Sequence, residues 1–187
     1  MRALAATAVA TLAALPAAAR AAESARAQGQ FAWLQQLEGD WVLAADQDSE
    51  AAKHPVIAPL VGSGTVALRY RLVGSRTTLQ ENIFPGTPRE MATMYHCVDK
   101  ACSQVMADHY CSLRNQPVLR AAPPTAPGQL VFQCDPAVAV CASPDAHLDR
   151  LTVERLEGSA NQLKTSFSIR KDGKIADLLV FHFERRK

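Results

Sequence analysis

The sequence has few aromatic residues and no apolar run long enough to cross a membrane. Phe, Trp and Tyr make up only 6% of its 187 residues, which argues against a large surface for stacking nucleic-acid bases. The longest apolar stretch, Ala3–Leu15, falls short of the about 20 residues that a spanning helix needs. Both absences weigh against nucleic acid and membrane as partners, while 48% hydrophobic residues exclude wholesale disorder.

Motifs for catalysis and metal binding are also missing. The sequence contains no C-x-x-C pair and no G-x-S-x-G elbow. Asp46, Asp48 and Glu50 begin like a calcium loop, but Ala51 replaces the required glycine and Ile57 occupies the final carboxylate position. We therefore expect no metal site and assign no catalytic residue.

The first residues have the pattern of a secretory signal peptide. Arg2 gives a positive start, Ala3–Leu15 is apolar, and Ala17–Ala21 offers small-x-small cleavage sites. We expect residues 1–21 to be a leader, with no integral membrane segment left after cleavage. The mature protein is then predicted to be periplasmic or secreted.

The mildly basic net charge depends on this leader. The whole chain has 20 Lys and Arg against 18 Asp and Glu, a formal charge of +2. Loss of Arg2 and Arg20 lowers the basic count from 20 to 18, so that it equals the acidic count. A neutral mature chain lacks the electrostatic attraction that draws proteins to nucleic acid or to anionic membranes.

Export makes the five cysteines candidates for oxidation, and their odd number leaves one over. Two local pairs are favoured by their short spacing, Cys97 with Cys102 and Cys134 with Cys141. Each such loop would stabilise the fold by about 2–2.5 kcal/mol on the chain-entropy account. Cys111 is then expected to be a free thiol.

The pattern of the mature chain predicts an all-β fold. Residues 22–30 are polar and expected to be flexible, and Phe31–Leu37 has helical spacing for one or two turns. From there to the end the period is two, as in Thr65–Leu72, where alternate residues are apolar. Eight or so strands with short turns indicate one domain, 31–187, in which an antiparallel meander closes into a β-barrel.

Two ends of the sequence resemble a calycin-type barrel, the group that includes the lipocalins. Gly39-Asp40-Trp41 resembles the G-x-W that opens the first strand of those proteins, after a short helix. In lipocalins an arginine on the last strand covers that tryptophan, and Arg185 or Arg186 is similarly placed. The resemblance implies a lipocalin-like barrel.

The middle of the chain resembles a family of exported bacterial proteins with a Y-H … H-Y-C-x-x-x-N-Q-P core and no established function. Here the core reads Tyr95-His96, His109-Tyr110-Cys111 and Asn115-Gln116-Pro117. The likeness extends from Trp33 to Arg185 and implies the barrel fold but no reaction. It also implies that His109, Cys111, Asn115 and Gln116 are the first residues to test, and that the four paired cysteines are additions to the family pattern.

The segment around Asp99-Lys100 is predicted to be a hairpin with a two-residue loop. Cys97 would then lie opposite Cys102, close enough for a disulfide. The same register places one apolar, inward face on Ala92, Met94, His96, Val105, Ala107, His109 and Cys111. On that register His96 and His109 lie about 20 Å apart, too far for one metal ion.

A second hairpin is predicted at Asp172-Gly173. Counting from that turn, His182 pairs with Leu163 and shares a face with Thr165 and Phe167. His182 is therefore expected to point into the barrel.

These predictions favour a non-catalytic barrel, a monomer or weak dimer, that holds a small, largely apolar molecule. The expected ligand contacts are His109, Cys111, Asn115, Gln116, His96, Tyr95 and His182. Three alternatives stay open: haem binding through His182 or His109, an enzyme using His109 and Cys111, and a filled barrel that serves as an interaction module. No other cofactor is expected.

Overall fold

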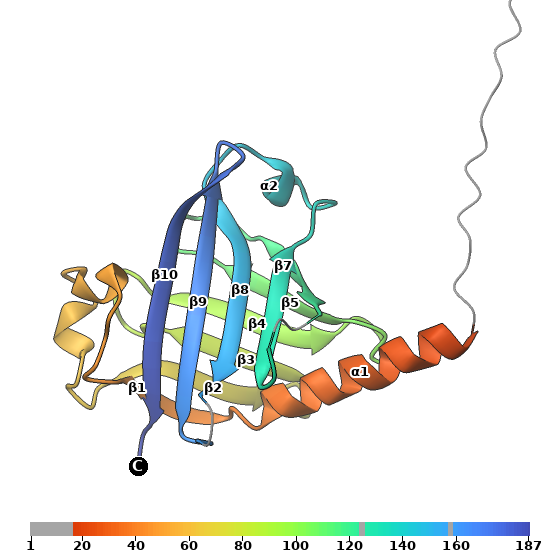
Figure 1. Ribbon diagram of the computed structural model, residues 1–187, viewed down its shortest axis with the longest axis horizontal. Coiled ribbons are helices and arrows are strands. Elements are labelled where there is room, and N and C mark those ends of the chain that lie inside the picture. Colours follow the sequence, from red (N-terminus) through yellow and green to blue (C-terminus); the bar gives the residue numbers. More distant parts are fainter. Residues whose placement is uncertain (1–16, 124–125, 157–158) are drawn as a thin grey trace, which may run out of the picture.

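Ten antiparallel strands form the body of the protein in the computed structural model, which describes residues 17–123, 126–156 and 159–187 (Figure 1). Each strand pairs with its neighbour in sequence, and β10 returns to pair with β1, so the sheet closes into a barrel. The strands are β1 Gly39–Leu43, β2 Val66–Val73, β3 Thr78–Ile83, β4 Met91–Cys97, β5 Val105–Tyr110, β6 Val118–Ala122, β7 Gln129–Cys134, β8 His147–Arg155, β9 Gln162–Lys171 and β10 Lys174–Arg185. The predicted all-β, lipocalin-like meander is confirmed, with β6 as a strand that the sequence analysis did not assign.

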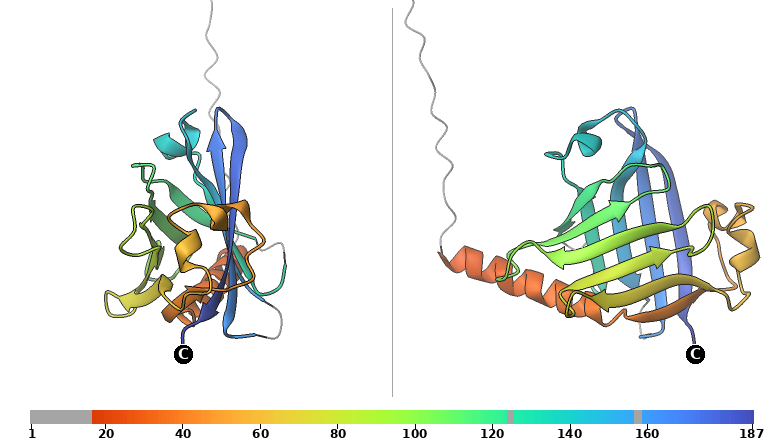
Figure 2. Two further views of the ribbon diagram at one scale, coloured as in Figure 1. Left: turned by 90° about the vertical axis from the view of Figure 1, so that its left-hand side faces the viewer. Right: turned by 180° about the vertical axis from the view of Figure 1, so that it is seen from behind.

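The period-two pattern explains which side chains fill the barrel. In β2, Leu68 and Tyr70 are fully buried, and in β3, Leu79, Glu81 and Ile83 alternate with half-buried polar residues. The sheet folds over on itself, so that β8–β10 cross β2–β5 at a steep angle (Figures 1 and 2). Side chains from the two halves meet between them and form the core.

A long helix, α1 (Ala17–Gln35), precedes the barrel and extends beside one end of it (Figure 2). Residues 22–30, expected to be flexible, belong to this helix, because the alanine-rich sequence favours helix and Ala27 and Leu34 are buried. Of the expected leader, residues 1–16 lie outside the described residues, and 17–21 form the start of α1. No helix in the described ranges is long and apolar enough to cross a membrane.

The end of the barrel next to α1 is closed around Trp41, which is fully buried. Its indole N–H donates to the carbonyl of Leu37 at 3.0 Å. The Arg185 guanidinium lies over the ring, 4.3 Å from its centre, and donates to the carbonyls of Glu38 and Gln36. The expected arginine over the tryptophan is thus Arg185, not Arg186.

Between β1 and β2 the chain makes a long excursion that contains two short 3-10 helices, η1 (Glu50–Lys53) and η2 (Ala58–Leu60). Figure 1 shows this excursion projecting beside β10, on the side away from α1. Ile57 is buried, and η1 contacts β10. The excursion therefore covers part of the barrel.

Both expected disulfides are present. Cys97 joins Cys102 with the Cα atoms 4.7 Å apart, and Cys134 joins Cys141, beside the short helix α2 (Ala139–Ala142), with the Cα atoms 5.6 Å apart. Cys111 is the free cysteine. The pairing predicted from spacing is therefore confirmed.

The predicted register of the hairpin at Asp99-Lys100 is wrong. Cys97 pairs with Val105, and the Val98 N–H donates to the carbonyl of Gln104, so the loop runs over residues 98–104. An odd shift in register turns a strand over. The face expected on β5 is correct, but on β4 Thr93 and Tyr95 point inward, and Ala92, Met94 and His96 point outward.

The orientation predicted for His182 is also wrong. The pairing of β10 with β9 shifts between Ile175 and Asp177, where one extra residue makes a bulge. Phe183 therefore pairs with Leu163, and His182 pairs with Lys164. Phe181 and Phe183 are buried, so His182 between them lies on the outer face.

Candidate cavity inside the barrel

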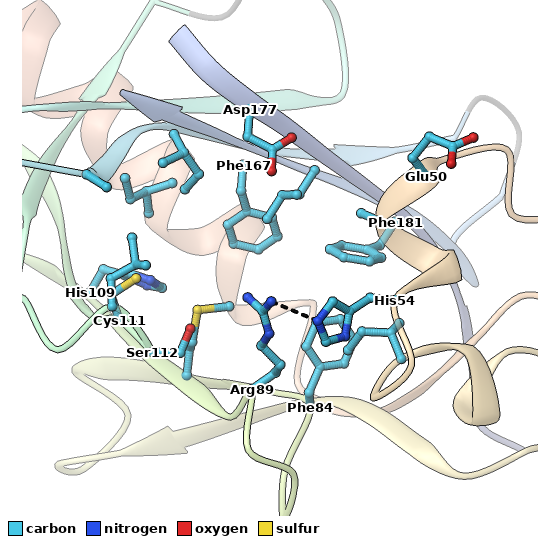
Figure 3. Close-up of a pocket in the computed structure, with 18 of the residues that line it drawn as sticks. Glu50, His54, Phe84, Arg89, His109, Cys111, Ser112, Phe167, Asp177 and Phe181 are labelled. Carbon is cyan, nitrogen blue, oxygen red and sulfur yellow. Dashed lines mark hydrogen bonds between the residues drawn. The ribbon is translucent and has the colours of Figure 1, made fainter. Parts of the chain in front are cut away.

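A cavity of about 500 Å³ lies between the barrel interior and the excursion after β1 (Figure 3). Its lining is mainly apolar and is drawn from β4, β5, β8, β9 and β10 and the loops beside them. The lining residues that are exposed, Glu50, Lys53, Arg89, Leu113 and Asp177, mark where it opens to solvent. This volume lies within the range that holds a small organic ligand.

Three phenylalanine rings form the apolar wall. Phe84 lies edge-on to Phe181 with ring centres 5.0 Å apart, and Phe167 meets Phe181 at 6.3 Å. Phe84 follows β3, Phe167 is on β9, and Phe181 is on β10, so both halves of the barrel contribute. All three are almost fully buried, yet each borders the cavity.

His109 is the polar group that the barrel brings deepest into this wall. It lies on β5 opposite Thr93 of β4 and is 1% exposed. Its Nδ1 lies 2.9 Å from the Thr93 hydroxyl. The residue lines the cavity, and Figure 3 shows its ring at the wall beside Cys111.

Behind Thr93 lies a fully buried carboxyl group, Glu81 of β3. Its Oε1 accepts from the Thr93 hydroxyl at 3.0 Å. Its Oε2 accepts from the hydroxyls of Tyr70 at 2.6 Å and Tyr95 at 2.8 Å. Three donors therefore satisfy a carboxylate that would otherwise be costly to bury.

Burial moves the pKa values of this cluster in the directions expected for a dry interior. It raises the pKa of Glu81, against the lowering effect of its three hydrogen bonds. Burial and the nearby Glu81 charge raise the pKa values of Tyr70 and Tyr95 well above 10.0, so both stay donors. Burial lowers the pKa of His109 from 6.5 to about 4, so its imidazole is neutral at pH 7.

The hydrogen bonds assign the proton on His109. The Thr93 hydroxyl has one hydrogen, which it donates to Glu81, so its oxygen accepts from Nδ1–H of His109. The neutral ring then carries a lone pair on Nε2. No described residue donates to Nε2, which leaves this acceptor for an occupant of the cavity.

Cys111, the first residue after β5, lines the same cavity. Burial raises the pKa of its thiol above 9.0, and the positive charge of Arg89 opposes that rise. The thiol is therefore protonated at pH 7 and is a weak nucleophile. Its position confirms that the predicted free cysteine borders the barrel interior.

The other predicted contacts lie away from the cavity wall. Tyr95 points inward, but its hydroxyl donates to Glu81 and does not line the cavity. Asn115 is half-buried in the turn after β5, where its amide donates to the carbonyl of Ala146 at 2.7 Å, and Gln116 is exposed. His96 faces outward and lies 3.2 Å from Asp108, and His182 is on the outer face of β10.

Four polar residues of the site were not predicted from the sequence, namely Glu81, Thr93, His54 and Arg89. Glu81 had a readable signal, because it alternates with Leu79 and Ile83 on an otherwise apolar strand face. Thr93 was not predicted because the expected register of β4 placed it on the outer face of the barrel. His54 and Arg89 lie in loops, and nothing in the sequence indicates that their side chains meet.

These features define a closed β-barrel with a mainly apolar cavity and an acceptor, Nε2 of His109, at the cavity wall. In the described ranges no three His, Cys, Asp or Glu side chains come together as a metal site. Searches against protein-family models, curated proteins and solved structures find no match to this chain. Its function is therefore argued from the site itself.

Proposed function

We propose that the protein is an exported, non-catalytic binding protein that holds one small, largely apolar molecule in its barrel. The observation that carries this proposal is the cavity of about 500 Å³, bordered by Phe84, Phe167 and Phe181. Apolar surface removed from water contributes about 25 cal/mol per Å², so a ligand filling this space gains most of its affinity from burial.

His109 would orient such a ligand. A ligand that fills the cavity removes water from Nε2 of His109, so a ligand group that donates a hydrogen bond to it is favoured, because a polar group left unmatched on burial costs about 1–3 kcal/mol. The pKa of His109, lowered to about 4 by burial, supports a role as a fixed acceptor rather than as a proton carrier at neutral pH. The raised thiol pKa of Cys111 likewise favours binding over nucleophilic catalysis.

An oxidising compartment fits the two disulfides, Cys97–Cys102 and Cys134–Cys141. We therefore propose a periplasmic or secreted protein whose leader ends at Ala19 or Ala21. A monomer suffices for the proposed function, because a single chain supplies the whole cavity wall.

The proposal is tested by titrating the purified protein with the neutral fluorescent probe N-phenylnaphthylamine. We expect saturable binding at one site per chain. Ala51→Phe, in η1 at the cavity wall, should weaken binding at least about tenfold, because the added ring occupies ligand space.

The matched control is Ala58→Phe, which adds the same ring at an exposed position of η2. It should bind the probe as the wild type does. Equal binding by Ala51→Phe and the wild type, or no saturable binding by either, would contradict the proposal and favour a filled barrel that acts as an interaction module.

A second candidate, haem binding, rests on His109 alone, because His182 faces outward. The Thr93 hydroxyl, which is itself bonded to Glu81, accepts from Nδ1–H of His109. Histidines that bind a metal through Nε2 commonly donate Nδ1–H to a second group in this way, which fixes the ring. Titration with haemin tests it: binding through His109 would give a sharpened Soret band that His109→Asn loses. An unchanged spectrum in both proteins would exclude this candidate.

A further inference from the structure

Two donors meet at the mouth of the cavity. His54 follows η1 in the excursion after β1, and Arg89 precedes β4. Figure 3 shows the Arg89 side chain extending across the mouth towards the imidazole. The guanidinium Nη2 lies 2.9 Å from Nε2 of His54.

The His54 imidazole faces two N–H donors but can accept a hydrogen bond from only one of them. Its Nδ1 faces the backbone N–H of Val56 at 3.2 Å, while its Nε2 faces Arg89. A neutral imidazole has one acceptor nitrogen and one N–H, so it accepts from only one of these two donors. In the tautomer with its hydrogen on Nε2, Nδ1 accepts from Val56, and the Nε2–H and the Arg89 N–H face each other without an acceptor.

The charge of Arg89 is also unmatched. It forms no ion pair with any carboxylate in the described ranges. The carboxylate of its neighbour Glu90 accepts instead from the Asn82 amide and the Gly86 N–H. The guanidinium lies near the cavity instead, where its charge partly opposes the rise that burial causes in the pKa of the Cys111 thiol.

The acidic groups at the mouth lie on its opposite side and are engaged. Figure 3 shows Glu50 and Asp177 across the opening from Arg89. Glu50 pairs with Lys53, and Asp177 accepts from the backbone N–H of Leu178 at 2.8 Å. The mouth thus has a donor side, made by the Arg89 guanidinium and the neutral His54 imidazole, directly beside the apolar wall of Phe84.

We propose that the ligand is an amphiphile with a single carboxylate, held at the mouth by Arg89 and the Nε2–H of His54 while its apolar chain enters the cavity. One carboxylate supplies the acceptors that both donors lack. A guanidinium matches the planar, two-oxygen geometry of a carboxylate, and hydrogen bonds to charged groups are the strong ones. This inference rests on the proposed function and names its ligand class.

Three probes with the same tail separate charge from hydrophobicity: dodecanoate, its methyl ester and dodecyltrimethylammonium. At about pH 8, where the acid is ionised, competition against N-phenylnaphthylamine gives their affinities. We expect dodecanoate to bind about tenfold or more tightly than the ester, and the cation to bind most weakly.

Arg89→Met should remove the preference, so that dodecanoate weakens about tenfold and the ester changes little. Arg150→Met is the matched control, because Arg150 is exposed on the outer face of β8 and bonds to Gln133. It should keep the full preference. His54→Phe, which removes the second donor, should reduce the preference but leave ester binding intact.

The outcomes distinguish this inference from the proposed function. Equal affinities for acid and ester in the wild type, or an acid preference that survives Arg89→Met, would overturn the carboxylate site while leaving a ligand-binding cavity. Failure of all three probes to displace N-phenylnaphthylamine would likewise overturn it. If N-phenylnaphthylamine itself does not bind, both proposals fail together.

Discussion

At the scale of single residues, the barrel interior holds a chain of hydrogen bonds that ends at the ligand space. Glu81 is buried because Tyr70, Tyr95 and Thr93 donate to it, and Thr93 in turn accepts from His109. The chain fixes the ring of His109 and directs a lone pair to the cavity. A buried acid thus sets the polarity of a site that it does not touch.

The low pKa of His109 predicts a dependence of stability on pH. Its folded pKa of about 4 lies below 6.5, so its contribution is present above pH 6.5 and is lost as the pH falls towards 4. His109→Asn keeps a donor for Thr93 but does not titrate. Between pH 6.5 and 4 the wild type should lose up to about 3 kcal/mol more of its free energy of unfolding than this variant.

Urea unfolding at a series of pH values measures this difference. The raised pKa of Glu81 acts in the opposite direction, stabilising the fold at low pH and losing that effect as the pH rises, but it is present in both proteins. Parallel pH profiles of the wild type and His109→Asn would show that His109 titrates normally in the folded state.

Cys111 provides a chemical report on the cavity. Because burial raises its thiol pKa, alkylation by iodoacetamide at about pH 8 should be slower than that of a free cysteine. N-phenylnaphthylamine at about ten times its Kd should slow the reaction a further tenfold or so. At the same concentration the probe should slow the reaction of Ala51→Phe no more than about twofold, because this variant binds it at least about tenfold more weakly. Equal protection in both proteins would place the probe outside the cavity.

At the scale of the elements, alternation in the sequence predicts most strands but not always their faces. β2, β3 and β9 follow the pattern, because short turns or strong alternation fix them. The face of β4 was lost because the loop over 98–104 is longer than Asp99-Lys100 indicates, and that of β10 because of the bulge after Ile175. One extra residue reverses a strand, and no local pattern marks it.

Arg185 joins three elements, which makes it a test of the closure near α1. It covers Trp41 of β1 and donates to the carbonyls of Glu38 and Gln36 after α1. Arg185→Lys retains the charge but not the two-pronged geometry, so we expect a loss of about 1–2 kcal/mol in the free energy of unfolding. Arg186→Lys is the control. Equal stability of both variants in urea would contradict this account.

At the scale of the whole molecule, the site depends on contacts that sequence patterns do not encode. His54 and Arg89 come from two loops, and the cavity exists because the excursion after β1 lies against β10. His109 and Cys111 were singled out from the sequence by the resemblance to the H-Y-C core, and the face expected for them on β5 is correct although Val105, Met106 and Ala107 are all buried. The barrel closure between β1 and β10 supports the meander predicted from strand number and short turns.

The proposed leader makes a prediction about the mature chain. The buried contacts of α1, Ala27 and Leu34, lie beyond Ala21, as does Ser24, which donates to the carbonyl of Ala101. A chain that begins at Ala22 should therefore unfold within about 0.5 kcal/mol of the full chain. A chain that begins at Gln28 loses Ala27 and should be less stable. Equal stability of all three in urea would show that α1 does not support the barrel.

Native mass spectrometry of the protein, purified gently after export to a bacterial periplasm, tests the central claim most directly. We predict a mature chain with two disulfides that carries one small ligand, and we predict that Ala51→Phe loses this ligand while Ala58→Phe retains it. A bare chain in all three, still bare after addition of N-phenylnaphthylamine or dodecanoate, would contradict a ligand-binding barrel.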